Sequence, residues 1–279
     1  MINSQDLTYF MQIAKEGHLS KAAQTLGVTQ PTLSHSLKKI ENELGLELFI
    51  RSKKGVKLTA PGEKLYQHGH EFLLHWNQLF EQLHNEVNVV QGLIKLGCHT
   101  AVAKYTLPNF IPKLTKNYPK LKIQLFHDLS RNITAKVIAD EIDIGIVVNP
   151  IEHNELVIKP LLIDQVTLWK PKNCLNEKLL MLDPDLIQSQ YILNKMKGFK
   201  SKYGQTLESS SLEVIALLLE SGAGHAILPE KVIMSLKSKN IVKVNEAPKF
   251  NDRICLIYKH EFRKLKRGEV FINTLVATI

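Results

Sequence analysis

The stretch that most constrains the fold runs over residues 19–45, LSKAAQTLGVTQPTLSHSLKKIENELG. Ser20 is placed to cap a first helix, and Gly27 supplies the left-handed residue that ends it. Thr29 is placed to cap a second helix, and Pro31 falls in its first turn, where a missing N–H costs nothing. The second helix carries an apolar stripe made of Leu33, Leu37, Ile40 and Leu44. The stretch therefore predicts two helices joined by a short, fixed turn.

The opposite side of the second helix is hydrophilic. Its outward or flanking residues are Gln30, Thr32, Ser34, His35, Lys38 and Lys39. Hydrogen-bonding and cationic side chains of this kind meet base edges and phosphates in the major groove of DNA. An isolated amphipathic helix would also show a polar side to solvent, so the surrounding elements decide between the two interpretations.

Sequence patterns typical of a further helix and of a β-hairpin flank the two predicted helices. Residues 6–14, DLTYFMQIA, predict a helix closed by Gly17, and residues 48–59, LFIRSKKGVKLT, predict a β-hairpin with a basic turn. The formal charge of +9 comes from residues 93–279, whereas residues 1–92 are balanced. Within residues 28–60, however, six basic residues outnumber three acidic ones. Three helices followed by a basic hairpin predict a winged helix-turn-helix over residues 1–59.

At these residues the chain resembles the LysR-type transcriptional regulators. The matching positions are Ala22, Ala23, Leu26, Thr29 to Ser34, Ile40, Glu41, Leu44, Gly45, Leu48, Phe49, Arg51 and Leu58 to Gly62. A spaced pattern over about forty residues is more specific than any short motif. The resemblance departs at His35, where many members have arginine or another long polar residue in the recognition helix.

The resemblance implies that the chain binds double-stranded promoter DNA. The residues assigned to this contact are Thr29, Gln30, Pro31, Thr32, Ser34, His35, Lys38, Arg51, Lys53 and Lys54. It also implies that the chain acts as a homodimer or homotetramer, with RNA polymerase as a further partner.

Residues 60–90 predict one long helix. Leu65, Phe72, Trp76, Leu79, Leu83 and Val90 follow each other at close to steps of three and four. Thirty residues of helix extend about 45 Å, more than a small DNA-binding domain can cover. The resemblance identifies this segment as the linker helix through which the family dimerises. The histidines of HEFLLH are five residues apart, one more than a zinc-binding HExxH motif requires, so no metal site is expected.

Beyond residue 92, strand and helix patterns alternate, as in a mostly parallel sheet with helices on its faces. The expected fold class is α+β for the first part and α/β for the second. The second part, residues 91–279, resembles the two-lobed effector domain of the same family, which looks like a periplasmic solute-binding protein. Lobe I is predicted at residues 91–161 and 249–279, and lobe II at residues 162–248.

Ligands of such sheets bind at the carboxyl ends of strands and at helix N-termini. The residues predicted to contact a small-molecule effector are His99, Thr100, Ala101, Ser130, Asn149, Ser209 and Ser210. Ser130, Ser209 and Ser210 could equally be helix caps. The basic charge of this half favours an anionic effector such as a small carboxylate, although solvated lysines explain the charge as well.

Neither a secretory signal nor a membrane-spanning stretch is recognisable, which predicts a cytoplasmic protein that does not contact the membrane. Cys98, Cys174 and Cys255 are far apart, so neither a disulfide framework nor a zinc site is indicated. GxSxG, Walker and strand-flanked GxGxxG motifs are missing, and we therefore expect no catalytic residues and no cofactor other than the effector.

Two other interpretations stay open. The first is a solute-binding or enzymatic α/β protein whose helical N-terminus is incidental. The second makes Cys98 or Cys174 a redox trigger, although neither has a resolving cysteine near it in the sequence.

Overall fold

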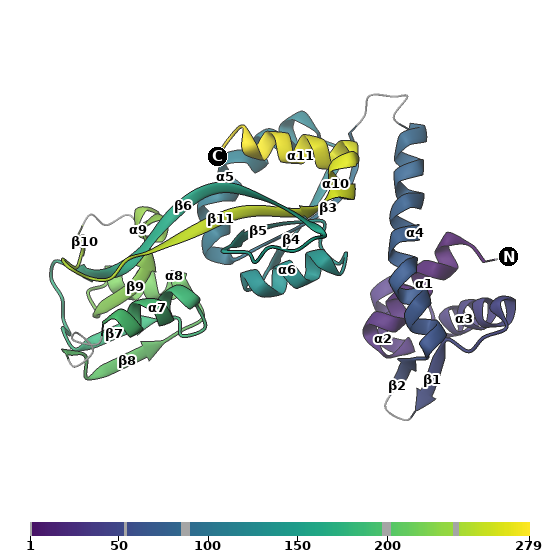
Figure 1. Ribbon diagram of the computed structural model, residues 1–279, viewed down its shortest axis with the longest axis horizontal. Coiled ribbons are helices and arrows are strands. Elements are labelled where there is room, and N and C mark those ends of the chain that lie inside the picture. Colours follow the sequence, from purple (N-terminus) through teal and green to yellow (C-terminus); the bar gives the residue numbers. More distant parts are fainter. Residues whose placement is uncertain (1, 53–54, 85–89, 197–201, 237–239) are drawn as a thin grey trace. The chain divides into compact units, whose positions relative to one another are not determined.

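The computed structural model describes residues 2–52, 55–84, 90–196, 202–236 and 240–279. The chain forms two compact units, Met1–Asn88 and Val89–Ile279 (Figure 1). Each has hydrophobic clusters of its own, so each is described by itself. Among the described helices, none has both the length and the apolar character that a bilayer crossing requires.

The first unit contains three helices, a hairpin and a long fourth helix. In chain order these are α1 (Ser4–Glu16), α2 (Leu19–Leu26), α3 (Gln30–Leu44), β1 (Phe49–Ser52), β2 (Gly55–Leu58) and α4 (Ala60–His84). Phe10 and Ile13 of α1 and Leu33, Leu37 and Ile40 of α3 are almost fully buried and form the centre of its core. The predicted helix-turn-helix and hairpin are confirmed.

The predictions for Ser20 and Leu44 were wrong. Ser20 does not cap α2, because the helix starts one residue before it, with His18 at the N-cap position. Leu44 is 43% exposed, since it lies in the last turn of α3, beyond the part of the helix that packs on the core. The predicted Thr29 cap is correct, because its side chain accepts a hydrogen bond from the Thr32 backbone N–H, and Pro31 lies in the first turn.

The hairpin is fixed against the turn between α1 and α2. The Val56 backbone N–H donates to the Gly17 carbonyl at 2.8 Å. Gly55 has φ +118°, and a Cβ there would lie 2.3 Å from the same carbonyl oxygen. Only glycine satisfies both conditions, so the residue that opens β2 sets how closely the wing approaches the helices.

The helix α4 shows two kinds of surface. Leu65, Tyr66 and Leu73 pack against the core of the first unit, whereas Phe72 and Leu79 are 52% and 47% exposed. Val90 was predicted to belong to the same seam, and this was wrong. It lies beyond the helix and packs against the core of the second unit. The side chain of Leu83 is outside the described part.

The second unit is built on a nine-stranded sheet with the order β4-β3-β5-β11-β6-β9-β7-β8, and β10 pairs with β6. Lobe I contains β3 (Gly92–Cys98), α5 (Thr100–Asn117), β4 (Leu121–His127), α6 (Ser130–Ile138) and β5 (Ile144–Val148). Its first three strands are parallel. The helix α5 begins at Thr100, where the His99 side chain caps it, and it contains Pro108 and Pro112.

Lobe II contains β7 (Leu179–Leu182), α7 (Ile187–Lys195), β8 (Gln205–Glu208), α8 (Leu212–Glu220), β9 (His225–Pro229), α9 (Glu230–Met234) and β10 (Ile241–Lys243). Its strands β8, β7 and β9 are also parallel to one another. The α8 helix packs on the sheet through Leu212, Ile215 and Leu219.

Two long antiparallel strands, β6 (Leu156–Pro171) and β11 (Phe250–Lys259), belong to both lobes (Figure 1). Their register shifts by one residue between Ile254 and Cys255, which is a β-bulge in the middle of the pair. The chain then returns to lobe I through α10 (His260–Lys264) and α11 (Lys266–Val276), where Phe271 packs edge-on against Phe110. Residue 162, the predicted start of lobe II, thus lies inside a continuous strand.

Candidate functional site

The outer side of α3 is the first candidate site. Thr29, Gln30, Pro31, Thr32, His35 and Lys38 are exposed or partly exposed, and Ser34 is half-buried. The buried stripe of Leu33, Leu37 and Ile40 holds the opposite side of the helix on the core. A helix fixed in this way presents its N-terminal half as a polar ridge that can enter the major groove of DNA.

Hydrogen bonds orient the start of this ridge. The hydroxyls of Thr29 and Thr32 lie 2.8 Å apart, and the Ser20 hydroxyl donates to Gln30 Oε1 at 3.2 Å. Ser20 therefore has a different role from the predicted cap: it positions the Gln30 amide across the turn. The amide nitrogen is then the group that can donate to a base or phosphate acceptor.

Lys39 was predicted to face outward or to flank the exposed side, and it is partly exposed but bound to α1. Its ammonium bonds the Asp6 carboxylate, which also accepts a hydrogen bond from Ser36 at 2.7 Å. Burial alone would raise the pKa of Asp6, but the hydrogen bonds from Lys39 and Ser36 lower it below its usual value. Lys39 therefore fastens α3 to α1, and Lys38 is the neighbouring lysine exposed to solvent.

The hairpin contributes cationic groups beside the helix. Arg51 and Lys57 are exposed on β1 and β2. The predicted DNA contacts Lys53 and Lys54 lie outside the described residues. A flexible cation on a wing contacts the phosphate backbone rather than base edges, which strengthens binding without reading sequence.

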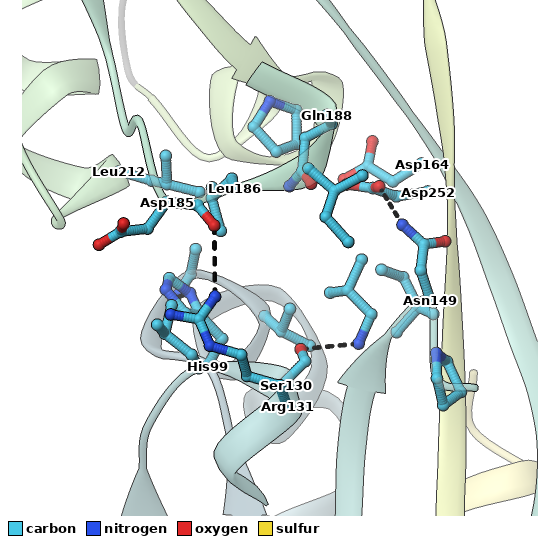
Figure 2. Close-up of a pocket in the computed structure, with 18 of the residues that line it drawn as sticks. His99, Ser130, Arg131, Asn149, Asp164, Asp185, Leu186, Gln188, Leu212 and Asp252 are labelled. Atoms are coloured by element: carbon cyan, nitrogen blue, oxygen red, sulfur yellow. Dashed lines mark hydrogen bonds between the residues drawn. The ribbon is translucent and has the colours of Figure 1, made fainter. Parts of the chain in front are cut away.

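The second candidate site is a pocket between the two lobes of the second unit, with a volume of about 270 Å³. Figure 2 shows His99, Ser130 and Asn149 of lobe I on one side of it and Asp185, Leu186, Gln188 and Leu212 of lobe II facing them. Asp164 and Asp252, from the shared strands β6 and β11, complete the wall. Four of the predicted effector residues line this pocket: His99, Ala101, Ser130 and Asn149.

The other three predicted effector residues are not in the lining. Thr100 is exposed in the first turn of α5. Ser209 and Ser210 precede the helix α8, whose cap is Ser211, one residue later. The Ser209 hydroxyl accepts a hydrogen bond from the Ser211 N–H and so supports this cap.

Internal hydrogen bonds define what two lining residues can offer a ligand. The Nδ1 atom of His99 accepts from the Ala101 N–H at 3.2 Å, so the imidazole presents Nε2 as its other polar atom. Burial lowers the pKa of His99, which favours the neutral ring. Ser130 Oγ accepts from the Val148 N–H at 2.9 Å, a bond that ties the start of α6 to the end of β5 (Figure 2). Ser130 is thus no helix cap.

Two buried aspartates in the lining were missed by the sequence reasoning. Asp164 on β6 and Asp252 on β11 are register partners, and only 3% and 2% of their surfaces are exposed. Burial raises the pKa of Asp164 to about 6 and that of Asp252 to about 7, and charge on Asp164 adds to the shift of Asp252. Asp252 Oδ1 accepts a hydrogen bond from Asn149 Nδ2 at 2.7 Å.

Asn149 itself connects β5 to β11. It adopts φ +49°, and its Oδ1 accepts from the Arg253 N–H at 2.8 Å. Asparagine tolerates this left-handed backbone better than most residues. The predicted residue is therefore in the pocket, where it positions the Asp252 carboxyl.

One contact crosses the mouth of the pocket. The Arg131 guanidinium, at the start of α6, donates to the Asp185 carbonyl at 3.4 Å (Figure 2). A single long bond between exposed groups is weak. It is a contact between lobes that a ligand could replace at little cost.

A polar cluster also lies outside the pocket. Cys174, Glu177 and His225 have ligand atoms within 4.8 Å of one another. His225 Nε2 lies 2.9 Å from Glu177 Oε2, and Nδ1 lies 2.6 Å from the Tyr203 hydroxyl. Both ring nitrogens thus have a polar neighbour within the described part of the protein.

Comparison with known proteins agrees with this architecture. The model of the bacterial regulatory helix-turn-helix proteins of the lysR family matches residues 4–63, and that of the LysR substrate binding domain matches residues 87–279. The chain belongs to the LysR family of DNA-binding transcriptional regulators, with a helix-turn-helix and an effector-binding domain. The predicted family and fold class are confirmed.

Individual relatives and solved structures have low sequence identity to this chain. The regulator BbuR of Bordetella bronchiseptica is 27% identical over 80% of this chain and 73% of its own length. The dual regulator OxyR of Escherichia coli is 27% identical over 82% and 79%. A full-length OxyR variant from Pseudomonas aeruginosa has a similar fold, with a TM-score of 0.70 and 24% identity over 99% of this chain and 95% of that one. CbnR in complex with its target DNA gives a TM-score of 0.58 at 16% identity, over 99% and 100%.

Proposed function

We propose that this regulator reads promoter DNA with the exposed side of α3 and changes its activity when a small molecule fills the pocket between its lobes. The observation that carries the proposal is the pocket of about 270 Å³ that is bounded by both lobes. The two lobes are connected by β6 and β11, which belong to both of them. A ligand that contacts both lobes favours one arrangement of them only by binding it more tightly than another.

The exposed apolar face of α4 supports self-association. Phe72 and Leu79 are seven residues apart and therefore lie on one side of the helix. A homodimer would cover this face and bring two α3 helices to a two-fold DNA site. A homotetramer, contact with RNA polymerase, a cytoplasmic location and the lack of catalytic activity stay predictions.

Selection of fragments from the source genome with the full-length protein tests the DNA-binding part. We expect recovery of a defined site with two-fold symmetry. Footprints of that site with and without candidate metabolites then test the effector part, and at least one metabolite should alter the protected region. Identical protection with all of them would reduce the protein to a static DNA binder.

Gln30→Ala and Arg51→Ala separate base reading from phosphate binding. We expect Gln30→Ala to lower the preference for the selected site over mutated sites by about 1–3 kcal/mol. Ser34→Ala should act in the same direction but less, because Ser34 is half-buried. Arg51→Ala should weaken binding to all sequences and lower the slope of log K against log salt by about 1. Competition binding at several salt concentrations measures both, and equal loss of specificity in the Arg51 variant would contradict the division.

A redox response is the second candidate, because several relatives are named hydrogen peroxide-inducible genes activators. The environments of the cysteines oppose it. Burial raises the pKa of Cys98 to about 12 and also raises those of Cys174 and Cys255. Because the thiolate is the form that reacts with peroxide, these shifts disfavour the reaction of all three thiols.

A further inference from the structure

We propose that the effector is a small organic cation, whose ammonium or guanidinium group binds the paired carboxyls of Asp164 and Asp252 at the wall of the pocket. The inference rests on the proposed function of this pocket as the effector site and names the chemical class of its ligand.

The position of the pair is the first argument. The two aspartates are opposite each other on the antiparallel strands that join the lobes, and both line the pocket. Figure 2 shows their carboxyls close together, with Asn149 reaching Asp252 from the side of β5. Burying two neighbouring carboxyls is costly unless a cation or several donors face them.

The second argument is an acceptor without a donor. Asp164 Oδ1 accepts from the Lys231 backbone N–H at 3.1 Å, but Asp164 Oδ2 is buried and has no hydrogen-bond partner among the described residues. Buried polar atoms in native proteins are almost always satisfied. Because this oxygen lies at the wall of the pocket, a ligand with a hydrogen-bond donor would satisfy it. An ammonium group has up to three N–H donors.

The charges around the pocket point the same way. The groups that act on Asp164 include the side chains of Lys231 and Glu230 at the start of α9, which oppose each other. The only cationic side chain in the described lining is Arg131, at the exposed mouth, while Asp185 adds a third carboxylate. Two further acids, Asp183 and Glu213, act on His99 from lobe II. An anion would add to the repulsion between these carboxylates, whereas a cation would reduce it.

Titration behaviour is consistent with this arrangement. Burial raises the pKa values of both aspartates. Burial, and to a lesser extent the charges of the two aspartates, also raise the pKa of Tyr105, which lines the pocket. The expectation of an anionic effector came from the net charge of this half of the chain. The local charge at the pocket has the opposite sign, and it is the local charge that a bound ligand meets.

The rest of the pocket lining is better suited to an organic cation than to a metal ion. Val102, Leu186, Leu212 and Ile254 give the pocket a largely apolar lining. Divalent cations such as magnesium and calcium prefer a shell of oxygen ligands, which this wall does not provide. A cation with a short hydrocarbon body would bury that body against the apolar residues while its charged end meets the carboxyls.

Thermal unfolding of the full-length protein with three matched probes tests the inference. Butylammonium chloride, 1-butanol and sodium butyrate share one hydrocarbon body and differ in charge. At pH 8 and constant ionic strength set with potassium chloride, we expect butylammonium to raise the unfolding temperature in a saturable way. Butanol should have little effect and butyrate none.

Asp164→Asn and Asp252→Asn keep the shape of each side chain and remove its charge. We expect butylammonium to bind each variant about tenfold more weakly, or worse, because a charge-assisted hydrogen bond is lost. Glu269→Gln is the control, since it removes an exposed carboxylate on α11 that pairs with Lys266, and it should bind like the parent. The folded state of each variant is checked by its unfolding transition without ligand.

The outcomes separate the class of ligand from the function. Stabilisation by butyrate but not butylammonium would keep the pocket as an effector site and overturn the cationic ligand. Equal stabilisation of the parent and both aspartate variants by butylammonium, or no stabilisation by it at all, would also overturn it. Failure to select any specific DNA site would instead overturn the proposed function, whatever the amine does.

Discussion

At the scale of single residues, Lys38 and Lys39 show how neighbours in the sequence take different roles. Lys38→Ala should leave stability unchanged and weaken binding to any DNA, with a salt slope about 1 smaller. Lys39→Ala should leave the salt slope unchanged and destabilise the first unit by about 1–3 kcal/mol, because the buried Asp6 carboxylate loses a partner. Salt-dependent DNA binding and urea unfolding measure the two effects. Equal effects of both variants on the salt slope would show that Lys39 also contacts DNA.

The paired aspartates make stability depend on pH. Because burial raises the folded-state pKa of Asp252 to about 7, above its usual value of 3.8, the native state binds more protons than the unfolded state between these values. Stability should therefore fall as pH rises from about 4 to 7, by up to about 1.4 kcal/mol per pH unit. Above the folded pKa no further loss from this group is expected.

Asp252→Asn removes the contribution of Asp252 to this dependence. The difference in stability between the variant and the parent should be more favourable to the variant at pH 8 than at pH 5. Unfolding temperatures of both proteins at the two pH values, without ligand, measure this difference. Glu269→Gln is the matched control and should follow the parent. The same pH profile for the parent and the Asp252 variant would indicate that the carboxyl titrates normally in the folded protein.

Whether a site residue could be predicted from the sequence has a physical explanation. His99, Ser130 and Asn149 were found because they follow strands, and topology places the ends of strands at the pocket. Ser209 and Ser210 failed because a serine run does not reveal which member caps the helix. Asp252 had a signal that was overlooked: it occupies a position in phase with the buried residues of its strand, where a carboxylate is costly. Asp164 could be paired with it only through the register of β6 and β11.

At the scale of elements, α4 tests the proposed dimer. Phe72→Lys should shift the protein towards monomer, since it places a charge in the apolar face that would be buried between two copies. Gln67→Lys is the control, because Gln67 is exposed and lies roughly 140° around the helix from Phe72. Sedimentation equilibrium gives the mass of each variant. An unchanged mass for Phe72→Lys would place the self-association surface elsewhere.

The extent of each element was less predictable than its type. The helix-turn-helix could be predicted because its caps, glycine and apolar stripe all indicate the same structure. The long helix was extended to Val90 because a heptad-like spacing does not show where one compact unit ends. Val90 is apolar for a different reason, namely its contact with the core of the second unit.

At the scale of the whole molecule, the two units differ in how they depend on the C-terminus. A chain that ends at residue 249 retains every described element of the first unit but loses β11, which lies between β5 and β6 in the sheet. We expect limited proteolysis to leave a resistant fragment close to residues 1–88 and to degrade the rest. A resistant fragment that includes residues 90–248 would show that the second unit folds without β11.

The position of β11 also fixes an order during synthesis on the ribosome. The sheet of the second unit cannot be completed until this strand leaves the exit tunnel, whereas the described strands and helices up to α4 have emerged well before it. A growing polypeptide thus acquires its DNA-binding unit while the effector-binding domain, which we propose responds to a small molecule, is still unfinished. Any nascent copy that reached its operator early would occupy it without being able to respond.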